Sequence, residues 1–204
     1  RGGFRAVIYL ALQEPLNDTQ QQLLEVFLTN AAVGYENVHL FQKLNNVAYK
    51  DWLTNLPNRL EFVRLLDLFA KNDCENEVAA LIDLNHFSDV NDGLGQDVGN
   101  LLLAAVSQRL QRYFGASKVA RVGADVFGVL GTQEYLTPEA LVQLFELPFV
   151  AGEQKLPINA CFGFCTKEHA NASGVQVLNQ INIALNLAKK QRIEHFAYYN
   201  PEME

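Results

Sequence analysis

The chain has 204 residues, of which 49% are hydrophobic and 19% are charged, and its formal net charge is −7. This composition is typical of a folded globular protein, and the negative charge argues against nucleic acid or an anionic membrane as a general partner. The three cysteines form no CxxC pair, and no apolar run approaches the roughly 18 residues of a membrane span. We therefore expect a cytoplasmic protein with no membrane segment in this stretch. Because the sequence starts at Arg1 without a methionine, we also expect it to be part of a longer protein.

The first elements predicted along the chain are a strand at residues 4–12 and a long helix at residues 18–49, with Asp18 or Thr19 as its N-cap. Apolar and small residues recur along this helix at alternating spacings of three and four, which is the pattern of a heptad seam. The seam consists of Leu24, Phe27, Ala31, Gly34, Val38, Phe41, Asn45 and Ala48. It predicts a homodimer through a coiled coil. The alternative interpretation is a helix that packs on its own domain.

Helices and strands alternate after residue 50. Residues 51–59 predict a turn that places Pro57 in the first turn of the next helix, and residues 77–84 form an apolar run typical of a central strand. The remaining predictions are a short helix from about His86, a helix at 97–113, a hairpin at 119–130, a helix at 138–145, a strand at 155–165, a helix at 174–190 and a strand at 195–199. This order predicts an α/β (α+β) fold in which helices cover a sheet.

Three stretches carry a family resemblance: DWLTNLPNR at 51–59, LIDLNHFSDVNDGLGQDVGN at 81–100 and VARVGADVFGVL at 119–130. In this order they resemble the GGDEF family, the diguanylate cyclases that join two GTP molecules into cyclic di-GMP. The resemblance covers roughly residues 47–199 and implies a ferredoxin-like core like that of nucleotide cyclases and polymerase palms. It divides the chain into the end of a GAF-like sensory domain (1–17), a signalling helix (18–49), the GGDEF domain (50–200) and the start of a linker (201–204).

The resemblance also implies a Mg²⁺ site. The family binds metal through the first aspartate of a D-x-D run, the carbonyl that follows and the acids at the hairpin tip, which correspond here to Asp83, the Leu84 carbonyl and Asp125. Mg²⁺ would neutralise the phosphate under attack, held by one or two carboxylates and by the phosphates themselves. The alternative interpretation is that the two acids only cap a strand end and a turn.

The signature motif departs from the family pattern. It reads GADVF, from Gly123 through Ala124, Asp125 and Val126 to Phe127, where the family has GGDEF. Val126 therefore replaces the glutamate that the family uses for metal binding and for activation of the attacking hydroxyl. Losing such a group commonly costs on the order of 10² to 10⁴ in rate. If Ala124 needs a left-handed backbone, its Cβ costs about 1–2 kcal/mol.

Nucleotide recognition is only partly retained. The resemblance assigns base recognition to Asn91 and Asn100, and a phosphate contact to Lys189, but Asn100 replaces an aspartate. An amide cannot accept hydrogen bonds from two ring donors as a carboxylate does. Other family positions are lost: Ser88 replaces a lysine, Gln96 a histidine and Ile193 an arginine, and FGAS at 114–117 replaces the R-x-x-D of the inhibitory product site.

These departures leave three hypotheses. In the first, the domain is a degenerate GGDEF domain without cyclase activity, which serves as a regulatory or dimerising module in cyclic di-GMP signalling and binds GTP weakly. In the second, it is a slow diguanylate cyclase that uses Asp125 and Mg²⁺ alone. In the third, it passes conformational signals without any ligand to an EAL phosphodiesterase domain further along the chain, since YYNPEME at 198–204 resembles the linker into such a domain.

Overall fold

The computed structural model describes residues 9, 11, 14–170, 173–191 and 195–203, without the side chains of residues 44–47. This part of the chain forms two compact units, Arg1–Leu44 and Asn45–Glu204. The strand predicted at residues 4–12 falls almost wholly outside the described residues. No helix among those described is both long and apolar enough to cross a membrane.

Helix α1 (Asp18–Tyr49) confirms the long helix predicted from the sequence. Its N-cap is Asn17, so the prediction of Asp18 or Thr19 was wrong. The Asn17 side chain accepts a hydrogen bond from the Gln20 amide (2.9 Å), and the Gln20 side chain accepts one from the Asn17 amide (3.1 Å). This reciprocal pair satisfies two backbone donors at once, which neither predicted cap achieves.

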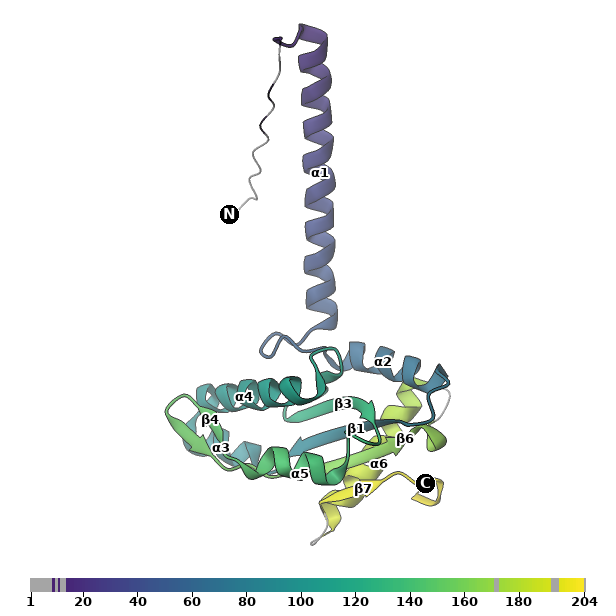
Figure 1. The fold of residues 1–204 in the computed structure, drawn as a ribbon. Helices are drawn as coiled ribbons and strands as arrows, with labels where there is room; N and C mark the ends of the chain where they lie inside the picture. Colours follow the sequence, from purple (N-terminus) through teal and green to yellow (C-terminus); the bar gives the residue numbers. More distant parts are fainter. Residues whose placement is uncertain (1–8, 10, 12–13, 171–172, 192–194, 204) are drawn as a thin grey trace. The chain divides into compact units, whose positions relative to one another are not determined.

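The second unit contains most of the regular structure (Figure 1). Its helices and strands are α2 (Arg59–Lys71), β1 (Glu77–Leu84), α3 (Phe87–Leu94), α4 (Gln96–Phe114), β2 (Val119–Arg121), β3 (Val126–Thr132), α5 (Pro138–Glu146), β4 (Phe149–Ala151), β5 (Gln154–Leu156), β6 (Ala160–Thr166), α6 (Gly174–Lys190) and β7 (Phe196–Tyr198). Short 3₁₀ turns follow at Lys167–His169 and Pro201–Met203.

The main sheet has five strands in the order β2-β3-β1-β6-β7. Strand β1 lies at its centre and pairs antiparallel with β3 and β6, and β7 is parallel to β6. With α4 and α5 as the connecting helices, β1, β2, β3 and β6 form the βαββαβ arrangement of a ferredoxin-like fold. The prediction of this core is confirmed, and α6 adds β7 to it.

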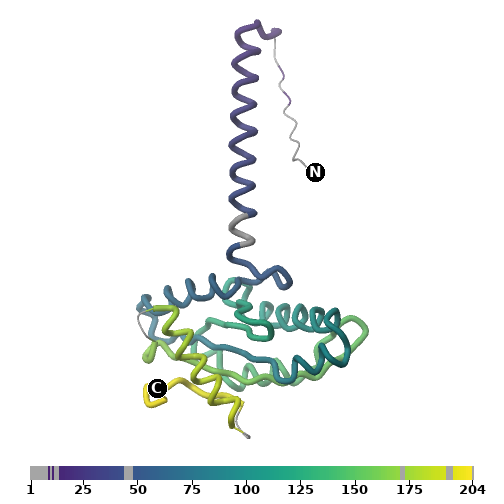
Figure 2. Tube along the Cα trace, turned by 180° about the vertical axis from the view of Figure 1, so that it is seen from behind, coloured from purple at the N-terminus to yellow at the C-terminus, as the bar shows by residue number. Residues whose placement is uncertain are grey.

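Two apolar clusters cover the two faces of the sheet. One contains side chains of α4 and α5, and the other contains side chains of α2 and α6. Figure 1 shows α5 in front of the sheet, and Figure 2, from the opposite side, shows α6 in front of it. Along β1, Val78, Ala80 and Ile82 belong to the first cluster and Ala79 and Leu81 to the second, as alternation in a strand requires. Asp83 follows Leu81 by two residues and therefore lies on the same face of the sheet as the second cluster.

Two local predictions close to prolines were wrong. Pro57 precedes the N-cap Asn58, whose side chain accepts a hydrogen bond from the Glu61 amide (3.1 Å), so α2 begins one residue after that cap rather than around Pro57. The single strand predicted at 155–165 is two strands, β5 and β6, because Pro157 interrupts it and proline cannot donate to a sheet. Strand β4, which pairs with β5 across a turn at Gly152, was not predicted.

Candidate nucleotide and metal site

Asp83 lies near the end of the central strand, on the face of the sheet that α6 covers. Its neighbours in register are Val126 on β3 and Cys161 on β6. Its side chain is 13% exposed, and its Oδ2 lies 2.6 Å from Lys189 Nζ in the last turn of α6. The fold therefore brings a predicted metal ligand and a predicted phosphate contact into a direct ion pair.

Asp125 approaches the same strand end from the signature hairpin. The Leu84 amide donates to the Asp125 carbonyl (3.1 Å), which fixes the hairpin tip against β1. Burial and then the charge of Asp83 raise the pKa of Asp125, and Lys189 and Arg121 oppose this only in part. The two carboxylates thus form a like-charge pair that a cation would relieve.

Mg²⁺ fits this donor set only in company with a nucleotide. Among the residues the structure describes, no cluster of three or more His, Cys, Asp or Glu side chains could hold a metal. Mg²⁺ is commonly bound by one or two carboxylates together with substrate phosphates and water. Asp83, the Leu84 carbonyl and Asp125 would supply the protein's share, and the ion would supply charge neutralisation at the phosphates.

Val126 faces the same side of the sheet as Asp83, directly across from it. It is half-buried and packs against the cluster shared with α2 and α6. Its Cβ would lie 3.3 Å from a Cβ added to Gly123. The fourth signature position is thus filled by hydrocarbon at the point where the family places a carboxylate. Ala124 is not among the described residues with positive φ, so the left-handed strain considered above does not arise there.

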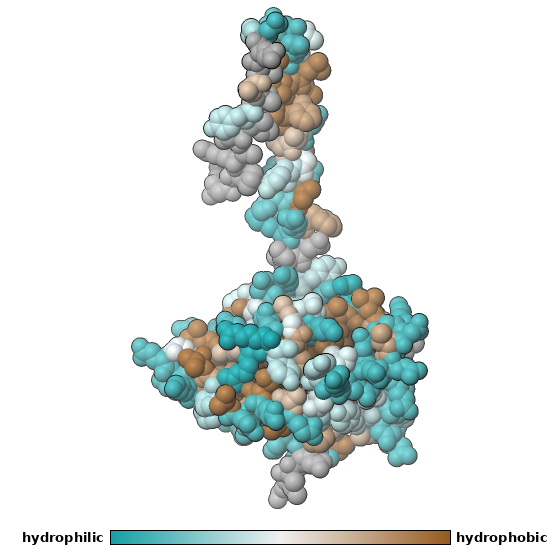
Figure 3. Space-filling model, viewed as in Figure 1, coloured by the Kyte–Doolittle hydropathy of each residue, from teal (hydrophilic) through white to brown (hydrophobic). Residues whose placement is uncertain are grey.

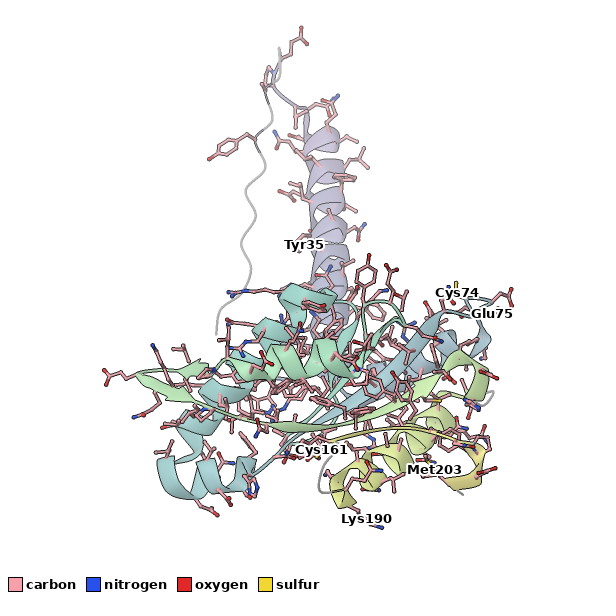
Figure 4. All side chains as sticks on the ribbon, turned by 60° about the horizontal axis from the view of Figure 1, so that its bottom comes forward. Tyr35, Cys74, Glu75, Cys161, Lys190 and Met203 are labelled. Carbon is pink, nitrogen blue, oxygen red and sulfur yellow. The ribbon has the colours of Figure 1, made fainter. Side chains whose placement is uncertain are left out.

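Two buried thiols lie on the α6 side of the sheet. Cys161, labelled in Figure 4, donates from Sγ to Asn85 Oδ1 (3.3 Å) beside Asp83. Burial raises the pKa of Cys161, although the bond to Asn85 opposes this. Burial also raises the pKa of Cys165 to about 12. Neither thiol is therefore poised as a nucleophile.

The predicted base-recognition residues lie on the two helices either side of Gly95, Asn91 on α3 and Asn100 on α4. The Asn91 side chain lies over Gly99, because a Cβ at Gly99 would fall 1.9 Å from Asn91 Oδ1. Asn100 is the next residue of α4, and both amides are half-buried. Among the described residues, no hydrogen bond joins these amides to Asp83 or Asp125.

A further link was not assigned any role from the sequence. Arg121 Nη1 lies 3.1 and 3.2 Å from the two carboxylate oxygens of Asp51, and Nη2 donates to the Ala124 carbonyl (2.7 Å). The Arg121 amide also donates to the Pro57 carbonyl (2.8 Å). Arg121 therefore ties the signature hairpin to the turn that follows α1. Its position in the R-x-G-G-D-E-F pattern was the available signal.

That turn also holds the end of α1. The Asn58 amide and side chain donate to the carbonyls of Tyr49 and Ala48 (2.9 and 2.8 Å). Asp51 accepts hydrogen bonds from the amide and hydroxyl of Thr54 (2.8 and 2.7 Å). Contacts therefore run without a break from the last residues of α1 to the hairpin that carries Asp125.

The positions of the expected phosphate contacts are mostly open. Ser88 and Gln96 are exposed on α3 and at the start of α4, and Ile193 lies outside the described residues. The FGAS segment spans the end of α4 and the loop before β2, without an arginine or an aspartate. Lys189 alone supplies a cation from the predicted set.

A five-stranded ferredoxin-like sheet, with two carboxylates at the end of its central strand and on the adjacent hairpin, defines a domain of the nucleotide-cyclase type. Residues 48–195 match the family profile described as "Diguanylate cyclase, GGDEF domain". The chain belongs to the GGDEF family. Residues 1–44 match a different profile, "Domain of unknown function (DUF3369)", and the GAF-like domain expected there is not shown.

The names of individual relatives state different activities. The chain is 30% identical to "Diguanylate cyclase DgcN" of Escherichia coli over 163 residues, which cover 74% of this chain and 40% of DgcN. It is also 30% identical to "Cyclic di-GMP phosphodiesterase NbdA" of Pseudomonas aeruginosa over 161 residues, or 74% of this chain and 20% of NbdA. The chain thus spans less than half the length of either relative, and GGDEF domains of cyclic di-GMP signalling proteins are its relatives.

A solved structure has the same fold. The coiled coil and GGDEF domain of DgcB from Caulobacter crescentus, in complex with c-di-GMP, matches with a TM-score of 0.68 and 22% identity. The match covers 86% of this chain and 98% of that one. At this identity the match establishes the fold.

Proposed function

We propose that this is a GGDEF domain without diguanylate cyclase activity, which serves as a regulatory and dimerising module in cyclic di-GMP signalling and binds GTP weakly with Mg²⁺. Val126 is the observation that carries the proposal. It stands opposite Asp83, and its side chain packs against an apolar cluster. A hydrocarbon there can neither bind Mg²⁺ nor accept a proton, and loss of such a group typically costs about 10² to 10⁴ in rate.

Weak GTP binding is supported by the polar residues that the chain has at the family's metal and base positions. Asp83 and Asp125 form a like-charge pair suited to Mg²⁺, and Asn91 and Asn100 offer a polar contact for a base. Affinity is expected to be low because Lys189 already neutralises Asp83 (2.6 Å) and must leave it to reach a phosphate. Ser88 and Gln96 add no charge to help it.

The direct test is incubation of the protein with GTP and Mg²⁺, followed by chromatography for cyclic di-GMP, with the Val126→Glu variant assayed in parallel. We expect no product from the natural sequence. Robust synthesis by it would overturn the proposal in favour of the alternative, a weakly active cyclase. If a trace of product appears and Val126→Glu does not increase it, Val126 is not the cause of the low cyclase activity.

Dimerisation is supported by the surface of α1. Several large apolar side chains on it are more than half exposed, including Phe27 (66%), Val38 (57%) and Phe41 (65%), and Figure 3 shows apolar side chains along this helix. Exposed apolar stripes of this kind are typical of helices that associate. The three residues named here belong to the heptad seam. Of the remaining seam residues, Asn45 is the one whose side chain the structure does not describe.

A second candidate function is transmission of a signal without a ligand, with a downstream EAL phosphodiesterase domain as the recipient. The observation in its favour is the unbroken set of contacts from α1 through Asp51 to Arg121. The phosphodiesterase name of NbdA, of which this chain spans 20%, agrees with such a setting. In this case Asp83→Ala and Asp125→Ala would leave regulation of the full-length protein unchanged, whereas the first proposal requires both acids for the response to GTP.

A further inference from the structure

Asn91 on α3 and Asn100 on α4 differ from other asparagines in the described part of the chain in their hydrogen bonding. Asn58 bonds to the backbone with both ends of its amide, Asn85 accepts from a thiol and Asn182 donates to the Leu178 carbonyl. In contrast, the side chains of Asn91 and Asn100 make no hydrogen bond to any described residue, although both are half-buried. Each retains two donors and an acceptor oxygen for a ligand.

The backbone is shaped to keep these amides in place. Gly95, with φ of +88°, separates the two helices, and its amide donates to the Asn91 carbonyl (2.9 Å). Gly99 lies inside α4, where glycine costs about 1 kcal/mol relative to alanine. A Cβ at Gly99 would clash with Asn91 Oδ1 (1.9 Å) and approach Phe87 Cζ (3.3 Å). The glycine therefore leaves room for the Asn91 amide against the first turns of α4, one residue before Asn100.

We propose that Asn100 shifts the preference of this site from guanine to a base that carries a carbonyl at position 2, namely xanthine. This inference rests on the proposed function, because it takes the α3–α4 site to receive a nucleotide. Guanine presents two neighbouring donors, the ring N1–H and the amino group at C2. Xanthine presents the same N1–H next to a C2 carbonyl, which is one donor and one acceptor.

The Asn100 amide matches the second pattern. Its Oδ1 accepts from N1–H, and its Nδ2 donates to the C2 carbonyl of xanthine. Against guanine, Nδ2 faces an amino group, so two donors are brought together and neither has a partner. Leaving such groups unpaired in a half-buried site costs about 1–3 kcal/mol, or roughly 10- to 100-fold in affinity. Inosine, which has hydrogen at C2, has neither the bond nor the conflict.

The test is calorimetric titration of the whole chain with GTP, ITP and XTP in the presence of Mg²⁺. We expect XTP to bind about 10-fold or more tightly than GTP, with ITP between them. Asn100→Asp should reverse this order, because a carboxylate accepts from both donors of guanine. Asn30→Asp, which makes the same charge change at an exposed position of α1, should leave the order as in the natural sequence.

The outcomes separate this inference from the proposed function. Equal or tighter binding of GTP than of XTP by the natural sequence, with Asn100→Asp making no difference, would overturn the assignment of Asn100 and leave the nucleotide site standing. Failure of all three nucleotides to bind to the natural sequence and to Asn100→Asp would overturn both. Circular dichroism of each variant establishes that loss of binding is not loss of fold.

Discussion

Replacing Arg121 with methionine removes the guanidinium that joins the signature hairpin to the turn after α1. The Arg121 and Asp51 side chains are only 11% and 15% exposed, and Nη1 reaches both carboxylate oxygens of Asp51. Breaking a buried ion pair from one side costs about 3–5 kcal/mol. Because Asp51 keeps two hydrogen bonds from Thr54, we expect a smaller loss of about 2 kcal/mol in the free energy of unfolding.

A double-mutant cycle isolates the link itself. Asp51→Asn keeps an oxygen for Thr54 but removes the charge that faces Arg121. Urea unfolding of the natural sequence, the two single variants and the double variant should give a coupling energy of about 1–2 kcal/mol. The matched control is the pair Glu61 and Arg64 on α2, in which the arginine side chain is 58% exposed. Its coupling should be only about 0.3–0.5 kcal/mol.

The pH dependence follows from Asp51. Burial raises the pKa of Asp51, but hydrogen bonds from Thr54 and Arg121 outweigh it and hold the pKa below its ordinary value of 3.8. A carboxylate of this kind stabilises the fold above its ordinary pKa, and this contribution is lost as the pH falls through the lowered value. The coupling should therefore be the same at about pH 7 and pH 5 and should fall only in stronger acid. A coupling below about 0.3 kcal/mol at neutral pH would refute the link.

Other variants test the fold, the site and α1. Gly163→Ala places a Cβ 2.5 Å from the Leu185 amide nitrogen of α6, so we expect a loss of about 2–4 kcal/mol in the free energy of unfolding or failure to fold. The control Gly93→Ala, with open space around it, should gain up to about 1 kcal/mol. Equal effects of the two variants would contradict the packing of α6. Burial and the charge of Asp83 raise the pKa of Asp125, so the ionised form destabilises the fold above that pKa. Asp125→Asn should therefore gain about 0.5–1 kcal/mol in the free energy of unfolding at neutral pH while weakening Mg²⁺-dependent GTP binding. A loss of stability would mean that the Asp125 carboxylate is stabilised by its surroundings in the folded protein. Phe27→Glu should convert a dimer into a monomer in light scattering, and an unchanged mass would argue against the α1 seam.

The elements that the sequence predicts well are those with a strong local pattern. Residues 77–84 and 174–190 have the predicted bounds, because a continuous apolar run and an amphipathic period of 3.6 each indicate one kind of element. Strand β4 was missed because it is only three residues long, between a helix and Gly152. The glycine at 152 was the available signal for a hairpin there, and the structure gives it a φ of +64°.

The site is less accessible to sequence reasoning, because its contacts are non-local. The family resemblance supplied Asp83, Asp125 and Lys189 as separate assignments. That Lys189 is paired with Asp83, 106 positions away, follows only from the packing of α6 on β1. The contact of Arg121 with Asp51, 70 positions apart, likewise depends on where the hairpin meets the turn after α1. Local patterns carry no information about either pair.

The three thiols provide the domain with its own set of chemical probes. Cys74 is exposed in the loop after α2, whereas Cys161 is 5% exposed near the start of β6, next to Asp83, and Cys165 is fully buried. An alkylating reagent should therefore label Cys74 in the folded protein, reach Cys161 when the strand end opens, and reach Cys165 only on global unfolding. The order of labelling therefore distinguishes a surface loop, the end of a strand and the interior of the sheet without any substitution.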